Sequence, residues 1–97
     1  MKKLSYKIQK KEARIAIIGL GYVGLPIALE FNKAGFTVFG IDTNKRRIKD
    51  LLNRKSYIVD ISDRQIGEAI NRKNFFAGTD YKILKDIDII IVCVPTP

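Results

Sequence analysis

The stretch IAIIGLGYVGLP, residues 15–26, decides the fold of this 97-residue chain. Its first four residues are apolar, mostly β-branched and closed by a glycine, which is typical of a strand buried on both faces. Three glycines then follow with the spacing G-x-G-x-x-G, and apolar residues recur at helical spacing as far as Ala34. Pro26 falls in the first turn of this expected helix, where its missing N–H costs little. The stretch therefore predicts a strand, a glycine-rich turn and a helix in immediate succession.

The rest of the chain continues to alternate between strand and helix patterns. We expect strands over residues 37–41, 75–77 and 87–94, helices over residues 45–53 and from Ser62 onward, and a helical turn over 78–84. Ser62 precedes Gln65 at the spacing of a capping box. Buried strands that alternate with helices predict a parallel sheet, because right-handed crossovers place helices on its faces. We therefore expect an α/β fold: a Rossmann-type half with about four parallel strands in the order 3-2-1-4 and helices on both faces.

Composition excludes several classes of protein. Hydrophobic residues make up 46% and charged residues 29% of the chain, which is ordinary for a globular domain and too apolar for a disordered one. The longest apolar run, residues 89–94, is far shorter than the roughly 20 residues that span a bilayer. A single cysteine, Cys93, cannot form an internal disulfide, and there is no histidine for a catalytic triad or a metal site. We expect a cytoplasmic protein without membrane contact, and neither catalytic residues nor a metal site in this chain.

The net charge of +8 lies mostly at the N-terminus. Six of the 18 basic side chains but only one of the 10 acidic ones fall within residues 1–14. A nucleic-acid-binding domain would instead spread basic residues over a face or a recognition helix, so we expect no nucleic-acid partner. The sequence divides into a basic N-terminal arm, residues 1–13, and a domain over residues 14–97. We expect a turn or two of helix in the arm, with Leu4 and Ile8 resting on the domain.

The glycine turn has the features of a dinucleotide-binding loop. Gly19 would make the tight turn out of the strand, Gly21 would let the backbone approach a pyrophosphate, and Gly24 would let the helix pack closely on the sheet. The N-terminus of the helix offers N–H groups and partial positive charge to phosphates. The motif also follows a buried strand and opens an amphipathic helix, which is the required context. The alternative is a glycine turn that only packs helix on strand.

An acidic residue stands at the end of the second expected strand. Asp42 follows Gly24 by 18 residues and could accept hydrogen bonds from both ribose hydroxyls of an adenosine. A carboxylate there would repel a 2′-phosphate, which favours NAD over NADP, although the basic run of residues 45–47 weakens this inference. A capping role for the aspartate is the alternative.

The last expected strand ends beside the first, at the point where ligands bind in such sheets. Thr96 is thus placed to touch the central region of the cofactor, unless it is only a polar loop residue between prolines. Cys93 lies within this strand and is more readily explained as a small core residue than as a nucleophile. Tyr57 and Asp60 are interpreted as loop residues.

The quoted stretch and the final IIIVCVPTP, residues 89–97, resemble the N-terminal NAD-binding domain of the UDP-glucose/GDP-mannose dehydrogenase family. The resemblance extends over residues 13–97, and the continuation GYVGLP is its most specific part. Within the family, the segments SYI at residues 56–58 and DIS at 60–62 look most like the UDP-N-acetylglucosamine 6-dehydrogenase branch. The basic lead-in to Ile15 is also similar to that branch.

The resemblance implies an activity and a set of roles. Such enzymes oxidise the C6 hydroxymethyl group of a nucleotide sugar, of the UDP-N-acetylglucosamine or UDP-glucose type, to a carboxylate with two NAD⁺ through a cysteine thioester. That cysteine and its catalytic partners lie in a later part of the family's chain, so we expect this chain to be a fragment of a longer enzyme, and the parent to be a homo-oligomer. Asp42 and Arg47 would hold the adenosine ribose, and Thr96 would approach the nicotinamide. The expected cofactor-binding residues are Gly19, Leu20, Gly21, Tyr22, Val23, Gly24, Asp42, Arg47 and Thr96.

Two other functions remain open from the residues. A stand-alone NAD-sensing regulatory module would share the glycine loop and Asp42. A Rossmann-like methyltransferase fragment would more often carry G-x-G-x-G. The reading frame beyond Pro97 separates these functions, because a dehydrogenase would continue for about two more domains whereas a sensor would stop or lead into another module.

Overall fold

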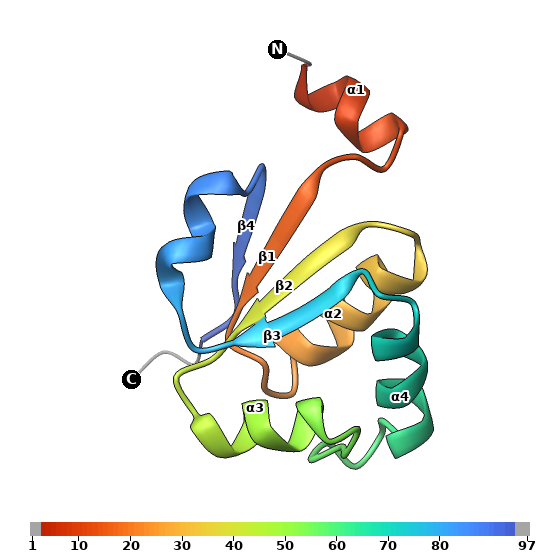
Figure 1. The fold of residues 1–97 in the computed structure, drawn as a ribbon, viewed down its shortest axis with the longest axis vertical. Helices are drawn as coiled ribbons and strands as arrows, with labels where there is room; N and C mark the ends of the chain where they lie inside the picture. Colours follow the sequence, from red (N-terminus) through yellow and green to blue (C-terminus); the bar gives the residue numbers. More distant parts are fainter. Residues whose placement is uncertain (1–2, 95–97) are drawn as a thin grey trace.

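The computed structural model describes residues 3–94, and its four strands form one parallel sheet in the order β3-β2-β1-β4 (Figure 1). The strands are β1 (Arg14–Ile18), β2 (Thr37–Ile41), β3 (Phe75–Gly78) and β4 (Ile89–Val92). The predicted strand order and direction are confirmed. β4 is shorter than the predicted 87–94 at both ends. The N–H of Ile87 donates to the carbonyl of Leu84 and so belongs to the preceding turn, and the strand ends at Val92, so Cys93 follows the strand and does not lie within it.

Helices cover the two faces of the sheet unequally. The helices are α1 (Leu4–Gln9), α2 (Gly24–Lys33), α3 (Lys45–Leu52), α4 (Asp63–Asn71) and the 3-10 helix η1 (Tyr81–Asp86). α2 lies behind the sheet in Figure 1, and η1 lies in front of it. On the front face, Ile83 of η1 lines a small cavity with Phe39 and Phe76, whose rings stack with centroids 5.2 Å apart. Among residues 3–94, α2, α3 and α4 thus pack on one face of the sheet, and η1 alone packs on the other.

The main core lies between the sheet and α2, α3 and α4. In β1, the side chains of Ile15, Ala16 and Ile17 are all at most 1% exposed, so this strand is buried on both faces as its sequence predicts. The core cluster comprises Ala13, Ile15, Ile17, Leu20, Leu25, Ala28, Leu29, Phe36, Val38, Ile48, Leu51, Ile58, Ile61, Ile66, Ala69 and Phe75. It joins every α-helix except α1 to the first three strands.

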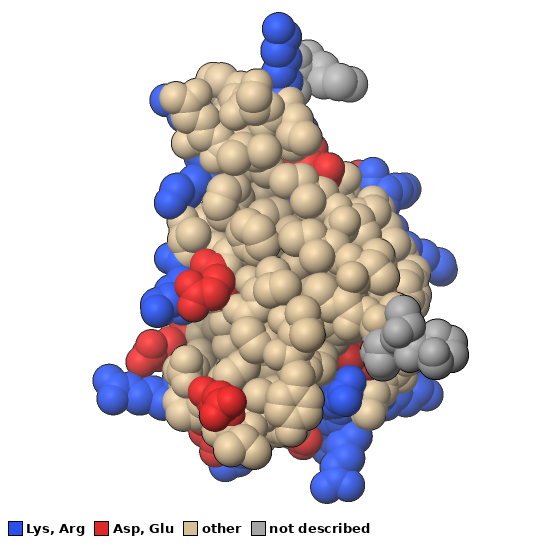
Figure 2. All heavy atoms as spheres, turned by 180° about the vertical axis from the view of Figure 1, so that it is seen from behind, with Lys and Arg blue, Asp and Glu red and all other residues tan. Residues whose placement is uncertain are grey.

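Apolar surface remains uncovered around β4. This edge strand pairs only with β1 among the described strands, and its Ile90 and Val92 are 47% and 62% exposed on the front face. On the opposite face, the charged side chains lie mainly toward the margin of the molecule and uncharged residues, polar and apolar, occupy its centre (Figure 2). Exposed apolar surface of this kind is typical of faces that contact other protein segments.

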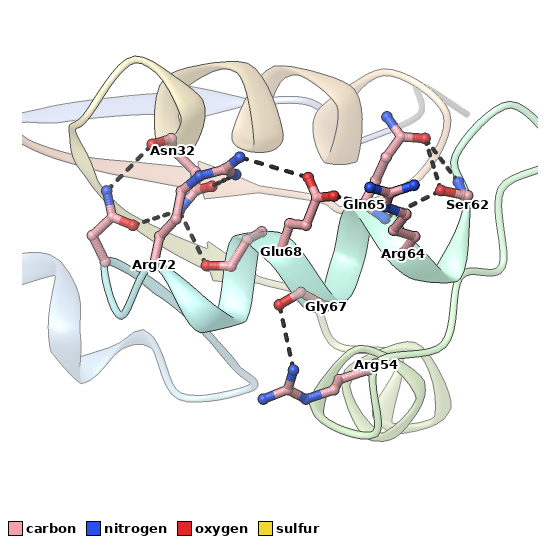
Figure 3. A network of polar contacts seen from close by, with 10 residues as sticks. Asn32, Arg54, Ser62, Arg64, Gln65, Gly67, Glu68 and Arg72 are labelled. Carbon is pink, nitrogen blue, oxygen red and sulfur yellow. Dashed lines mark hydrogen bonds and ion pairs between the residues drawn. The ribbon is translucent and has the colours of Figure 1, made fainter.

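A polar cluster around one buried amide joins α2 and α4 at the end of the sheet where β2 and β3 begin (Figure 3). Asn32 of α2 is fully buried; its amide donates to Asn74 Oδ1 at 2.6 Å and accepts from Arg72 Nη1 at 2.9 Å. The Asn74 amide in turn donates to the carbonyls of Asn32 and Phe36. We call Asn32, Arg72 and Asn74 the amide cluster. It fixes the distance between the two helices without an apolar contact at this point.

Side chains cap the N-termini of α3 and α4. Asn44 accepts hydrogen bonds from the N–H groups of Arg46 and Arg47 at the start of α3. Ser62 and Gln65 form the predicted reciprocal capping box of α4.

The basic arm forms α1, but its apolar residues do not rest on the domain as expected. No residue of α1 is buried, and Leu4 and Ile8 are both more than 40% exposed. Polar contacts hold the arm instead: Lys7 Nζ lies 2.8 Å from Asp88 Oδ1, and Lys11 donates to the carbonyl of Ala34. Six residues are too few for an apolar stripe long enough to anchor the helix.

Candidate functional site

The carboxyl ends of the strands meet at one edge of the sheet. Beyond β1, the N–H of Gly19 donates to the carbonyl of Ile41 at 2.8 Å, and the N–H of Cys93 donates to Ile18 at 2.7 Å. Beyond β2, the N–H of Asp42 donates to Gly78 at 3.2 Å. These bonds extend the parallel ladders by one residue. They hold the glycine loop, Asp42 and the end of β4 side by side, where ligands of parallel α/β sheets bind.

Two of the three motif glycines are required by close backbone approach. Gly19 has a φ of +95°, and a Cβ there would lie 2.9 Å from the carbonyl carbon of Cys93. A Cβ on Gly24 would lie 1.6 Å from the carbonyl oxygen of Gly19. Any other residue at these positions would displace the loop or α2. The structure thus provides the close helix–strand packing that the motif predicts for Gly24.

Gly21 differs, because it faces open space rather than backbone. The nearest atom to a Cβ placed on it would be Arg47 Nη1, at 3.6 Å. This space is a cleft of about 760 Å³, lined by Ile18, Gly19, Gly21, Tyr22, Val23, Ile41, Asp42, Thr43, Asn44, Arg47, Tyr81, Val92, Cys93 and Val94. Its size is within the range of roughly 300–1,000 Å³ that small-molecule sites occupy. A Cβ on Gly21 would fill part of this cleft.

The N-terminus of α2 opens onto the same cleft. Val23 is its N-cap residue and provides no side-chain acceptor. The N–H of Leu25 already donates to the carbonyl of Gly21 and Pro26 has no N–H, so the amides left for a ligand are those that precede Leu25. Tyr22 and Val23 line the cleft, with 71% and 61% of their surface exposed. The helix N-terminus and the uncapped N–H groups suit an anion such as a phosphate.

Asp42 is buried beside this loop and already accepts several hydrogen bonds. Its Oδ2 accepts from the N–H of Leu20 at 2.9 Å and from Arg47 Nη1 at 3.2 Å, and its Oδ1 accepts from the N–H of Asn44 at 2.8 Å. Asn44, and not Asp42, caps α3. The carboxylate therefore fixes the glycine loop to the start of α3, and of its roughly four acceptor sites one, on Oδ1, is left for a ligand.

These partners keep Asp42 ionised. Burial opposes ionisation, but the N–H groups of Asn44 and Leu20 and the Arg47 guanidinium outweigh it, so the pKa of Asp42 lies below its usual value. Only 7% of the residue is exposed, which limits competition from water. A buried carboxylate at the end of the second strand, oriented by backbone donors, is suited to accept hydrogen bonds from a ribose.

Contacts of Leu20 and Tyr57 fix the positions of the glycine loop and of Arg47. Leu20 is fully buried, and a Cβ on Gly40 would lie 2.8 Å from its Cδ1, so the side chain packs directly on β2. Arg47 extends from α3 over Gly21, and its guanidinium carbon lies 5.5 Å from the centroid of the Tyr57 ring. Tyr57 Oη donates to the carbonyl of Leu20 at 2.6 Å. Sequence reasoning interpreted Tyr57 as a loop residue, because no local pattern signals a contact across 37 residues.

Cys93 and Thr96 are the remaining residues whose roles were predicted from the sequence. Cys93 packs its Cβ near Gly24 and is partly buried at the edge of the core, in keeping with the small core residue expected from the sequence. Thr96 lies outside the described residues. Among residues 3–94, no group of three or more acidic or cysteine side chains is placed to hold a metal ion. None of the helices in the same range is long and apolar enough to cross a membrane.

Fold and site together define a class of protein. A parallel sheet in the order 3-2-1-4, a glycine turn into an uncapped helix and an acidic residue after the second strand are the features of a Rossmann-type dinucleotide-binding domain. The cleft fits such a cofactor, because the Gly21 backbone, the helix N-terminus and Asp42 all line it or open onto it.

Comparisons with known proteins narrow this class. Residues 13–97 match the model of the UDP-glucose/GDP-mannose dehydrogenase family, NAD binding domain. The chain is 44% identical over 87 residues to the UDP-N-acetyl-D-glucosamine 6-dehydrogenase of Salmonella typhi, covering 89% of this chain and 19% of the relative. It is 41% identical over 84 residues to the UDP-N-acetyl-D-mannosamine dehydrogenase of Methanocaldococcus jannaschii, covering 87% and 19%. The chain therefore belongs to the UDP-glucose/GDP-mannose dehydrogenase family, as its NAD-binding domain.

Solved structures agree with this assignment. The GDP-mannose dehydrogenase of Pseudomonas aeruginosa superposes with a TM-score of 0.80 at 32% identity, over 87% of this chain and 20% of that one. The UDP-N-acetyl-D-mannosamine dehydrogenase of Pyrococcus horikoshii gives a TM-score of 0.80 at 34% identity, with the same coverage. The chain thus spans about a fifth of the length of these relatives. The family's NAD-binding domain identifies the cofactor of this domain as NAD.

Proposed function

We propose that this chain binds NAD for a nucleotide-sugar 6-dehydrogenase, in which the catalytic residues belong to other parts of the enzyme. The observation that carries the proposal is the open cleft in which Gly21, the N-terminus of α2 and Asp42 meet. In this arrangement the N–H groups at the start of α2 hold the pyrophosphate, and Asp42 and Arg47 hold the adenosine ribose. Bound NAD supplies the hydride acceptor.

The proposed reaction of the parent enzyme is oxidation of the C6 hydroxymethyl group of a UDP-sugar to the uronate, with two NAD. The substrate is of the UDP-N-acetylglucosamine or UDP-glucose type. Similarity to the Salmonella typhi enzyme over 89% of the chain supports this substrate class. The Methanocaldococcus jannaschii relative is a UDP-N-acetyl-D-mannosamine dehydrogenase, so UDP-N-acetylmannosamine is the substrate to test beside UDP-N-acetylglucosamine. We also propose that the parent is a homo-oligomer.

Cofactor binding is tested by titrating the chain with NAD and NADP, using ligand-observed NMR so that dissociation constants in the millimolar range remain measurable. We expect NAD to bind more tightly than NADP, because the Asp42 carboxylate repels a 2′-phosphate. Equal binding of the two dinucleotides would contradict the proposed role of Asp42. An absence of NAD binding would contradict the proposed function of this chain.

The reaction is tested with a chimera in which this chain replaces the matching segment of the Salmonella typhi enzyme. NADH formation at 340 nm should show two NADH per UDP-N-acetylglucosamine consumed. The chain alone should form no NADH with any UDP-sugar, because two hydride transfers need a positioned nucleophile and base, and its only thiol, Cys93, packs beside Gly24. Turnover by the chain alone would place catalytic residues within it and contradict the proposal.

A further inference from the structure

Tyr57 connects the segment between α3 and α4 to the glycine loop. Its hydroxyl donates to the carbonyl of Leu20 at 2.6 Å, a short bond across 37 residues of sequence. The N–H of the same Leu20 donates to Asp42 Oδ2. Both sides of this loop residue are therefore fixed, one by a proposed ribose ligand and the other by Tyr57.

The aromatic ring of Tyr57 serves a second contact. The Arg47 guanidinium carbon lies 5.5 Å from the ring centroid, within the range of a cation–π interaction. The same guanidinium lies 3.2 Å from Asp42 Oδ2, and its Nη1 is the nearest atom to a Cβ placed on Gly21. Arg47 is thus held between the Tyr57 ring and the Asp42 carboxylate, directly over the part of the loop that opens to the cleft.

The surroundings of Tyr57 favour the protonated phenol, whose raised pKa keeps it a hydrogen-bond donor. Burial raises the pKa of its phenol, the Arg47 cation acts in the opposite direction, and the carboxylates of Asp42 and Asp50 raise the pKa further. The protonated phenol suits the carbonyl of Leu20, which can only accept.

The segment that carries Tyr57 does not need these contacts for its own structure. The N–H of Ser56 donates to Asp63 Oδ1 at 2.8 Å, and Ser56 Oγ bonds to both the N–H and the carbonyl of Ile58. Ile58 is itself buried in the core. The segment is therefore anchored on both sides of Tyr57, which leaves the tyrosine's polar contacts directed only at the glycine loop and Arg47.

We propose that Tyr57 is a positioning residue for the dinucleotide site: its hydroxyl fixes the glycine loop through Leu20, and its ring orients Arg47 toward the adenosine ribose. This role rests on the proposed binding of NAD. Tyr57 does not line the cleft, so it acts through the two residues that it contacts and not on the cofactor directly.

The experiment compares Tyr57→Phe, which loses only the hydroxyl, with Tyr57→Leu, which also loses the ring, each with Arg47 intact and in an Arg47→Met background. We expect Tyr57→Phe to raise the dissociation constant of NAD about two- to tenfold, the value of one neutral hydrogen bond. Tyr57→Leu should raise it by a further factor of about two to five through loss of the cation–π contact. That further factor should disappear when Arg47 is methionine. ADP-ribose, which lacks only the nicotinamide ring of NAD, should show the same factors.

Tyr6→Phe is the matched control, because Tyr6 lies in α1 and outside the cleft, and it should leave the NAD constant unchanged. Circular dichroism and urea unfolding verify that each variant is folded; should Tyr57→Leu fail to fold, Tyr57→Phe still tests the hydroxyl. An NAD dissociation constant that Tyr57→Phe leaves unchanged would overturn the positioning role. So would a ratio of the Tyr57→Leu to the Tyr57→Phe constant that is the same with Arg47 and with methionine at position 47. In either case, binding of NAD by the wild type would still uphold the proposed function. A wild-type chain that binds no NAD would overturn both.

Discussion

Two polar clusters at opposite ends of the same sheet show how one fold uses similar side chains for different purposes. The amide cluster lies where β2 and β3 begin, and its buried Asn32 amide bonds to the Asn74 amide and to the Arg72 guanidinium (Figure 3). At the opposite end, Asp42, Arg47 and Tyr57, here called the carboxylate cluster, border an open cleft of about 760 Å³. The first cluster joins two helices, whereas the second borders a cleft in which its donors and acceptors can bind a ligand.

The difference lies in what each cluster leaves unused. Among the described residues, no buried side-chain nitrogen or oxygen lacks a partner, and the Arg72 guanidinium, 37% exposed, bonds to Asn32 and also lies 3.8 Å from Glu68 Oε2. In the carboxylate cluster the Arg47 side chain is similarly exposed, at 39%, but it lines the cleft. Burial and charge are therefore poor guides to a binding site by themselves. The direction of the unused donors and acceptors is the better guide.

The largest expected effect comes from filling the cleft at Gly21. Gly21→Val places two methyl groups where the pyrophosphate is proposed to lie, and the nearest protein atom is the flexible end of Arg47, so the fold should survive. We expect no measurable NAD binding and an unchanged circular dichroism spectrum. Gly78→Ala is the control, because a Cβ there meets nothing within 4 Å. Retained NAD binding by Gly21→Val would refute the proposed loop geometry.

Removing the carboxylate should weaken binding without closing the cleft. Asp42→Ala loses a charged acceptor for the ribose and should cost about 1.5–3 kcal/mol of NAD binding free energy. It should also reduce the preference for NAD over NADP, because the repulsion of a 2′-phosphate is lost. Calorimetric or NMR titration of both dinucleotides measures the change. An NAD dissociation constant equal to that of the wild type would show that Asp42 serves only to tie the loop to α3.

The amide cluster should give the opposite result. Asn32→Ala removes the acceptor of Arg72 Nη1 and the donor to Asn74 Oδ1 and should lower the free energy of unfolding by about 1–3 kcal/mol. The NAD constant of the folded chain should not change. Arg64→Ala is the matched control on the same helix pair, because its exposed ion pair with Glu68 should contribute only about 0.3–0.5 kcal/mol. A weaker affinity for NAD in Asn32→Ala would show that the two ends of the sheet are coupled.

The smallest effect concerns the attachment of α1. The Lys7 ammonium and the N–H of Arg14 hold the pKa of Asp88 below its usual value of 3.8, so the contact is complete above that pH and is lost as the pH falls below it. Asp88→Asn should free the arm at neutral pH. Amide exchange of residues 4–9 measures this: it should be faster in the variant, and the wild type alone should lose protection on acidification. Equal exchange in both chains would show that Lys11 is sufficient to hold the arm.

Local patterns predicted most of the fold. The capping box of Ser62 and Gln65, the placement of Pro26 in the first turn of α2 and the strand order all follow from periodicity and short spacings, and the structure confirms each. The predicted packing of Leu4 and Ile8 is wrong, because apolar residues in so short a helix do not determine how it attaches.

The site was only partly predictable. The glycines and Asp42 belong to one spaced motif, so the sequence places them together. The contact of Tyr57 with Leu20, and that of Asn32 with Asn74, join residues 37 and 42 positions apart, and no periodicity marks such pairs. The sequence also predicted that Asp42 could accept hydrogen bonds from both ribose hydroxyls. It gave no sign that the same carboxylate accepts hydrogen bonds from Leu20, Asn44 and Arg47 within the protein.

Leu20 has a consequence for the kinetics and the entropy of binding. Its side chain, its N–H and its carbonyl are held by three different neighbours: Gly40, Asp42 and Tyr57. The loop is therefore immobilised during folding and not during ligand capture, so association should lose little backbone entropy in this region. We expect a single fast association phase without a slower rearrangement step, because the glycine loop already has the shape in which it meets the dinucleotide.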